Sequence, residues 1–171
     1  MQLVRRDPAV RVLVCTPSDT AADLLAECLA AAGLDPDKLY CLGVLSRYEE
    51  DISEDVQRSS LFPGLERLLA FRVVLSTCSS AGMLQALGVP VGHFSYIVID
   101  EAAQAEEPLA MIPITCFSSA HTNVILAGDP NQLGPNIKSP TAARAGLGKS
   151  YLERLMLMHE VYGLDTEAGK T

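Results

Sequence analysis

The chain has 171 residues, 49% of them hydrophobic and 20% charged, which suits one domain with a substantial core. Its formal net charge of −8 argues against a grip on nucleic acid that is spread over the whole surface. No stretch approaches the roughly 20 uninterrupted apolar residues that a membrane helix requires, and the N-terminus carries no secretory signal. We therefore expect a soluble, intracellular protein.

The five cysteines do not form a recognisable metal or disulfide framework. Their number is odd, they are scattered, and no C-x-x-C pair occurs. The three histidines lie far from metal-ligand spacing. We expect reduced, buried thiols.

Segments typical of strands and helices alternate along the first half of the chain. The order is a strand at 11–16, a helix at 19–32, a short strand at 38–42, an acidic loop or exposed helix at 48–60, and a helix at 61–70.

The alternation continues in the second half. It predicts a strand at 71–76, a helix at 79–87, a strand at 96–100, a helix at 106–114, a strand at 123–127, a turn-rich loop, and a helix at 149–158. Short unbroken apolar strands belong in a sheet that is covered on both faces. The sequence therefore predicts an α/β fold with a mainly parallel sheet flanked by helices.

Polar clusters follow four of the predicted strands. They lie at residues 16–18, 76–80, 100–101 and 128–135. Ligands of open parallel sheets bind at the carboxyl ends of the strands, so we expect one site that these four clusters share.

Asp100 and Glu101 end an apolar strand, as the acids of nucleotide hydrolases do. The first carboxylate could hold magnesium and the second could deprotonate the attacking water. The alternative is that both acids only favour the N-terminus of the following helix. No Lys or Arg occurs between Arg72 and Lys138. The positive charge that phosphate chemistry needs must therefore come from a bound metal ion and from residues outside this segment.

The sequence G-D-P-N-Q-L-G-P at 128–135 could be a tight connection, because Asp-Pro and Gly-Pro form turns. A turn does not require Gln132, however. Its amide can donate to a phosphate oxygen and accept from water, and could sense a γ-phosphate beside the acidic strand.

Together these segments resemble the superfamily 1 RNA helicases of the nonsense-decay and RNA-silencing type, the Armitage and Moloney-virus-ten branch. V-I-D-E-A-A-Q at 98–104 is similar to motif II, residues 128–135 to motif III, and V-C-T-P-S at 14–18 to motif Ia. L-S-T-C-S at 75–79 is similar to the next segment that contacts nucleic acid, and residues 146–155 to the stretch after motif III. Glu107-Pro108 and residues 111–113 resemble the silencing branch.

The resemblance implies a RecA-like P-loop NTPase domain with ATP and Mg²⁺ as cofactors. Residues 1–171 would form one partial core domain, from motif Ia to just after motif III, without the first strand, the Walker A loop and the second core domain. Because that first strand is normally central, a hydrophobic sheet edge would be exposed.

The resemblance also assigns roles. Asp100 would hold magnesium through water, Glu101 would be the general base, and Gln132 would contact the γ-phosphate. The residues implied to bind nucleotide are Asp100, Gln104, Gly128, Asp129 and Gln132; those implied to bind single-stranded RNA are Thr16, Pro17, Ser18, Ser76 and Thr77. Asp19 stands where the family usually has Asn, which puts an added negative charge beside the RNA.

Two segments mimic a Walker A loop, A-R-A-G-L-G-K-S at 143–150 and Gly169-Lys170-Thr171, but neither has the strand–loop–helix context. We therefore expect these residues alone not to turn over ATP at a useful rate. The alternatives are a non-catalytic module that binds RNA or protein, and a DNA helicase of the same superfamily. The branch further implies a cytoplasmic role in RNA silencing or transcript control, with possible ribonucleoprotein partners.

Overall fold

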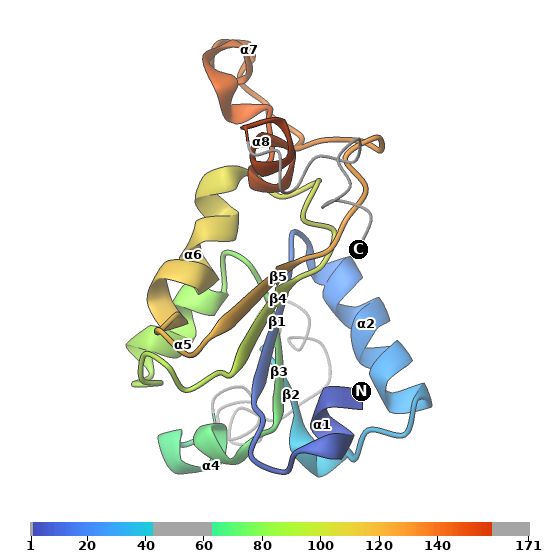
Figure 1. Ribbon diagram of the computed structural model, residues 1–171, viewed down its shortest axis with the longest axis vertical. Helices are drawn as coiled ribbons and strands as arrows, with labels where there is room; N and C mark the ends of the chain where they lie inside the picture. Colours follow the sequence, from blue (N-terminus) through green and yellow to red (C-terminus); the bar gives the residue numbers. More distant parts are fainter. Residues whose placement is uncertain (1, 43–62, 159–171) are drawn as a thin grey trace, which may run out of the picture.

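A computed structural model describes residues 2–42 and 63–158 of the chain. Five parallel strands form one sheet in the order β2-β3-β1-β4-β5, and helices cover both faces (Figure 1). The strands are β1 (Val12–Thr16), β2 (Leu39–Cys41), β3 (Val73–Thr77), β4 (Tyr96–Ile99) and β5 (Asn123–Leu126). This confirms the predicted parallel α/β fold. The prediction for residues 48–60 lies outside the described residues.

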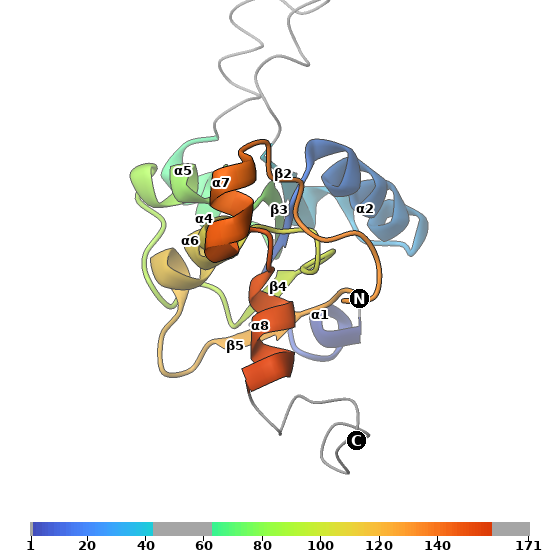
Figure 2. The same ribbon diagram turned by 90° about the horizontal axis from the view of Figure 1, so that it is seen from above.

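Alternate side chains of the central strand β1 enter two separate cores. Leu13 and Cys15 face the side that carries α4 (Leu65–Ala70), α5 (Ala81–Ala86) and α6 (Glu107–Phe117). Val12 and Val14 face α1 (Gln2–Arg6) and α2 (Asp19–Ala31). Figure 2 shows the two helical layers on either side of the sheet. Burial on both faces explains why the sequence of β1 shows no polar alternation.

Helix α2 begins and ends where its sequence indicates. The Ser18 hydroxyl accepts a hydrogen bond from the Ala21 amide at 3.3 Å, which caps the N-terminus. Gly33 follows the helix with a φ of +78°, a conformation that favours glycine.

Helix α6 extends three residues beyond the predicted end. Pro108 lies in its first turn, as expected, but the helix continues through Pro113 to Phe117. The Phe117 side chain is fully buried and packs edge-on against Phe94, with ring centroids 5.4 Å apart. This tertiary contact stabilises a last turn that local sequence did not predict.

The segment between β5 and α8 (Tyr151–Met158) is more structured than the predicted turn-rich loop. It contains α7 (Pro140–Ala142) and a π-helical turn at Ala143–Leu147, which project away from the sheet in Figure 1. Ser139 caps α7, since its hydroxyl accepts from the Ala142 amide at 3.3 Å. A 3-10 helix at Pro36–Lys38 likewise precedes β2.

Strand β5 is the exception to the buried pattern. It lies at the edge of the sheet, and Val124 and Ile125 are 39% and 40% exposed. These two side chains form a partly exposed hydrophobic edge of the sheet. Within the described part of the chain, the helices are too short or too polar to cross a membrane.

Candidate functional site

The parallel register brings the four polar clusters to one edge of the sheet. Thr16 pairs with Thr77, and Ile99 pairs with both Cys15 and Leu126. The amide of Asp100 donates to Cys15 O and that of Ala127 to Ile99 O, each at 2.8 Å. The residues that follow β1, β3, β4 and β5 are therefore neighbours, as the sequence predicted.

Asp100 and Glu101 differ in how their carboxylates are engaged. The Asp100 side chain is partly buried and has no hydrogen-bond or ion-pair partner among the described residues. The Glu101 carboxylate accepts from Gln104 Nε2 at 2.9 Å. Glu101 has a φ of +53°, and no other described non-glycine residue has a positive φ. This backbone conformation is uncommon outside glycine and sets the direction of the Glu101 side chain.

A free carboxylate at this position fits a magnesium ion. No group of three or more His, Cys, Asp or Glu among the described residues could enclose a metal. Mg²⁺ does not need such a group, because it usually keeps several waters and binds through one or two carboxylates plus substrate phosphates. Asp100 is therefore the residue that could hold the ion.

The segment after β4 contacts the segment after β5 through the backbone. The Ala102 amide donates to Ala127 O at 2.8 Å. A Cβ atom at Gly128 would lie 2.9 Å from the Ala103 nitrogen and 3.0 Å from the Ala102 nitrogen. Gly128 is thus required for the close approach of motif III to motif II.

The exposed loop after Gly128 is organised around Asp129. Asn131 donates its amide to Asp129 Oδ1 at 2.9 Å, and Gln132 Nε2 donates to Oδ2 at 3.3 Å. These hydrogen bonds, the backbone one of Asn131 foremost, lower the pKa of Asp129 below its usual range. The Gln132 amide is therefore oriented by its own loop, and its second N–H is available to donate to a phosphate.

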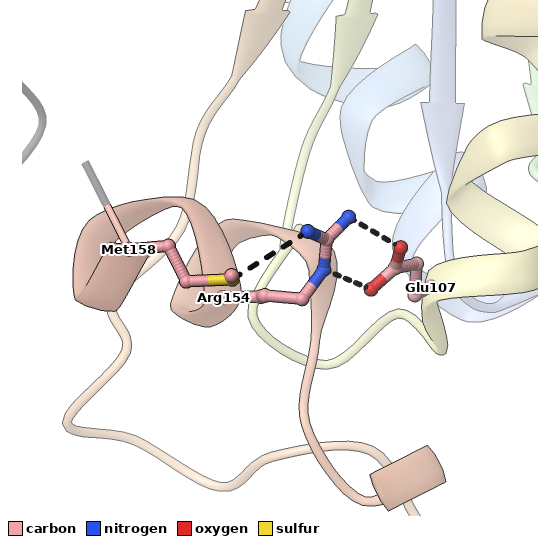
Figure 3. Close-up of polar contacts among 3 residues, drawn as sticks. All are labelled: Glu107, Arg154 and Met158. Atoms are coloured by element: carbon pink, nitrogen blue, oxygen red, sulfur yellow. Dashed lines mark hydrogen bonds and ion pairs between the residues drawn. The ribbon is translucent and has the colours of Figure 1, made fainter.

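A clamp joins the start of α6 to α8. Arg154 donates from Nη2 to Glu107 Oε1 at 2.6 Å and from Nε to Glu107 Oε2 at 2.7 Å (Figure 3). The Arg154 hydrogen bonds lower the pKa of Glu107, and the same pairing raises that of Arg154. Glu106 forms an isolated β-bridge with Ser150 beside the pair. The sequence marks Glu107 only by its resemblance to the silencing branch, and no sequence pattern links it to Arg154, 47 positions away.

Most of the hydroxyls predicted to bind RNA are turned inward. The side chain of Thr16 donates to Ser18 O at 2.8 Å, and that of Ser76 to Thr77 O at 2.6 Å. Thr77 shares its hydroxyl with Ser79 and Ser80, and all three predicted residues of the strand ends are buried. These hydroxyls shape the turns after β1 and β3.

The outer surface of the same turns is formed by their neighbours. Pro17 and Asp19 are partly exposed, and Ser18 and Ser79 are exposed. Ser79 belongs to the polar cluster at 76–80, but the resemblance did not assign it to RNA binding. Exposure, which sequence alone did not reveal, distinguishes it from Thr77.

An apolar cavity of about 280 Å³ opens beside Asp100, between the sheet and helices α1 and α2. Its lining includes Leu3, Val14, Leu25 and Val98. Such a lining suits neither phosphate nor a metal ion, so Asp100 contributes the polar rim of an otherwise hydrophobic space.

Comparison with known proteins identifies the family. Residues 44–140 match the model of the family described as "AAA domain". RNA helicase Mov10l1 of Homo sapiens is 40% identical over 160 residues, covering 87% of this chain and 12% of that protein. The Mus musculus protein of the same name is 41% identical over 160 residues, covering 87% of this chain and 13% of that protein.

A more distant relative is ATP-dependent helicase upf1 of Schizosaccharomyces pombe. It is 31% identical over 197 residues, covering 92% of this chain and 20% of that protein. The chain thus spans no more than about a fifth of the length of these relatives.

A solved structure supports the fold. The crystal structure of the C-terminal part of the Fun30 ATPase domain matches with a TM-score of 0.51 at 12% identity, covering 91% of this chain and 50% of that one. At this identity the likeness concerns the fold alone, which is consistent with a RecA-like α/β arrangement. The chain belongs to the AAA domain family and is related to the superfamily 1 RNA helicases of the Moloney-virus-ten type.

Proposed function

We propose that this chain is part of the first core domain of an ATP-dependent RNA helicase, from motif Ia to just after motif III. The observation that carries the proposal is the contact between the acidic segment after β4 and the Gln132 loop after β5. The Ala102–Ala127 hydrogen bond and the close approach of Gly128 hold the two segments together. The names of the relatives support RNA as the substrate and ATP as the energy source.

In this proposal Asp100 would hold Mg²⁺ through water, and the ion would supply positive charge toward the phosphates of ATP. Glu101 orients and deprotonates the attacking water, with Gln104 holding its carboxylate in place. Gln132 donates to the γ-phosphate through the N–H that does not contact Asp129, and Gly128 and Asp129 shape the loop. The phosphate-binding loop and the arginines that complete such a site are not among these residues.

Single-stranded RNA is proposed to cross the carboxyl edge of the sheet. Pro17, Ser18 and Ser79 offer the accessible surface there, while Thr16, Ser76 and Thr77 hold the turns. Backbone amides and hydroxyls can contact a sugar–phosphate chain without net positive charge. A role in RNA silencing or transcript control in the cytoplasm, with ribonucleoprotein partners, is part of the same proposal.

The experiment is a filter-binding measurement with the chain, using single-stranded RNA and DNA of one sequence, each with and without Mg²⁺ and ATP. We expect retention of RNA above DNA, because a reader of the 2′-hydroxyl prefers RNA. Equal retention of both would favour the DNA-helicase alternative. RNA retention that ignores nucleotide favours a non-catalytic binding module. No retention of either nucleic acid refutes the proposal for this chain.

A further inference from the structure

The charges of the described residues are sorted between the two ends of the sheet. Arg11, Lys38 and Arg72 each precede a strand directly and therefore lie at the amino edge, away from the proposed site. All three are engaged: Arg11 donates to Leu69 O at 3.1 Å, Arg72 to Val10 O at 2.7 Å, and Lys38 pairs with Asp35 at 3.5 Å. None of them can reach a ligand at the carboxyl edge.

Beyond Arg72, the described part of the chain holds four cations: Lys138, Arg144, Lys149 and Arg154. Arg154 is occupied by both oxygens of Glu107. The other three are exposed and have no hydrogen-bond or ion-pair partner among the described side chains. They are therefore the free positive charges nearest in sequence to the motif III loop.

These three residues lie on one small structural unit, residues 138–149, which we name the basic knob. Ser139 caps the helical turn, the Ala143 amide donates to Ser139 O at 3.0 Å, and the Lys149 amide donates to Gly146 O at 3.1 Å. A Cβ at Gly148 would lie 3.7 Å from Ala143 O, so the two ends of the turn are close. The segments that carry Lys138, Arg144 and Lys149 are thus held together.

The basic knob contains no acid in its own sequence, although Asp129 and Glu153 flank this region and Glu106 pairs with Ser150 beside Lys149. Residues 130–152 include no Asp or Glu, although the chain as a whole has a net charge of −8. The knob projects beyond the carboxyl ends of the strands in Figure 1. Its base adjoins the motif III loop, since a Cβ at Gly134 would lie 3.6 Å from Gly148 O. A local positive field beside an acidic body attracts a polyanion to one place and orients it.

We infer that Lys138, Arg144 and Lys149 bind the phosphate backbone of single-stranded RNA as it leaves the carboxyl edge of the sheet. The inference rests on the proposed RNA-binding function and supplies the cations that the strand ends lack. Small neighbours such as Ala142, Ala145 and Gly146 leave the backbone of the turn open to a sugar–phosphate chain.

The test compares two triple variants of the chain that change the net charge equally. K138Q/R144Q/K149Q neutralises the basic knob. R6Q/K38Q/R67Q neutralises three exposed cations near the amino edge, on or beside helices α1 and α4 at the opposite end of the molecule in Figure 1. Thermal unfolding of both variants verifies that they fold like the parent chain.

Fluorescence anisotropy with a labelled oligouridine measures affinity between about 50 and 200 mM salt. Each phosphate contact on a single strand contributes roughly 0.7 to the slope of log affinity against log salt. Three lost contacts should lower the slope by about 2 and weaken binding roughly tenfold to a hundredfold near 0.15 M salt. The amino-edge variant should keep the parent slope and lose less than about threefold.

The outcomes distinguish a failure of the proposed RNA-binding function from a failure of the basic knob alone. If the parent chain does not bind oligouridine, the proposed function fails and the inference fails with it. If the parent binds but K138Q/R144Q/K149Q keeps its affinity and its salt slope, only the basic knob is refuted. Equal losses in both triple variants would show a general charge effect and would also overturn the inference.

Discussion

The close approach of Gly128 to the motif II segment gives the sharpest prediction about the site. In the Gly128→Ala variant, the new Cβ would lie 2.9 Å from the Ala103 nitrogen and 3.0 Å from the Ala102 nitrogen. Both neighbours are backbone atoms, so relief requires a shift of the whole segment. Because the Ala102 amide donates to Ala127 O, that shift also weakens a 2.8 Å hydrogen bond.

Overpacking of this kind costs about 1–3 kcal/mol, and the hydrogen bond adds about 1 kcal/mol. For a chain of this size we expect the melting temperature to fall by about 4–16 °C. The matched control is Gly134→Ala in the same loop, where the new Cβ would lie 3.6 Å from Gly148 O. Both substitutions remove similar backbone freedom from the unfolded chain, so that effect cancels.

Circular dichroism follows the melting, and amide hydrogen exchange at Ala102 reports the contact directly. We expect faster exchange at Ala102 in the Gly128→Ala variant and no change in the control. If both variants melt alike and Ala102 stays protected, the contact between the two motifs does not have the geometry described here.

Three further predictions concern stability and reactivity. Because the Phe117 side chain is fully buried, Phe117→Ala should lower the free energy of unfolding by about 3–5 kcal/mol, measured by urea unfolding. A loss below about 1 kcal/mol would contradict its place in the core. Burial raises the pKa of the Cys78 thiol to about 12, so a thiol reagent at neutral pH should label exposed Cys28 well before Cys78, and the reverse order would be inconsistent with the burial. Arg154 lowers the pKa of Glu107 in the folded chain. The pair therefore stabilises the fold fully above the usual glutamate pKa of about 4.3, and this stabilisation is lost as the pH falls through the lower pKa of the folded state. The melting temperatures of the parent chain and of Glu107→Gln should accordingly differ slightly at pH 7 and converge in acid. A difference that does not change with pH would argue against the ion pair.

The strand segments and the edge that carries the site followed from patterns that are local in sequence. Apolar runs ending in polar clusters predicted which strands carry the site, and the parallel register then placed Asp100 beside Thr16, the last residue of β1. Side-chain orientation did not follow in the same way. Thr77 and Ser79 belong to one polar cluster, yet of these two only Ser79 is exposed. The Thr77 hydroxyl is turned inward, where it hydrogen-bonds within the turn.

Long-range pairing was equally hidden from the sequence. The last turn of α6 depends on Phe117 meeting Phe94, and the clamp depends on Glu107 meeting Arg154. Neither partner is signalled by spacing, because the packing of separate elements decides which side chains meet. The turn at Ala143–Leu147 was likewise not predicted, because a single turn interrupted by Gly146 at a φ of +110° is too short to give a helical pattern.

The two ends of the long motif III segment are fastened to the same short stretch of chain. At its start, Ala127 accepts the hydrogen bond of Ala102; at its end, Ser150 bridges Glu106 and Arg154 holds Glu107. The segment between them, which carries Gln132 and the basic knob, is therefore closed on the stretch that directly follows Asp100 and Glu101. A movement of Gln132 toward a phosphate cannot be absorbed at a free end, so it must be taken up within the loop or passed to the knob. If the basic knob binds RNA, the nucleotide site and the bound RNA are therefore both anchored to the stretch of chain that directly follows Asp100 and Glu101.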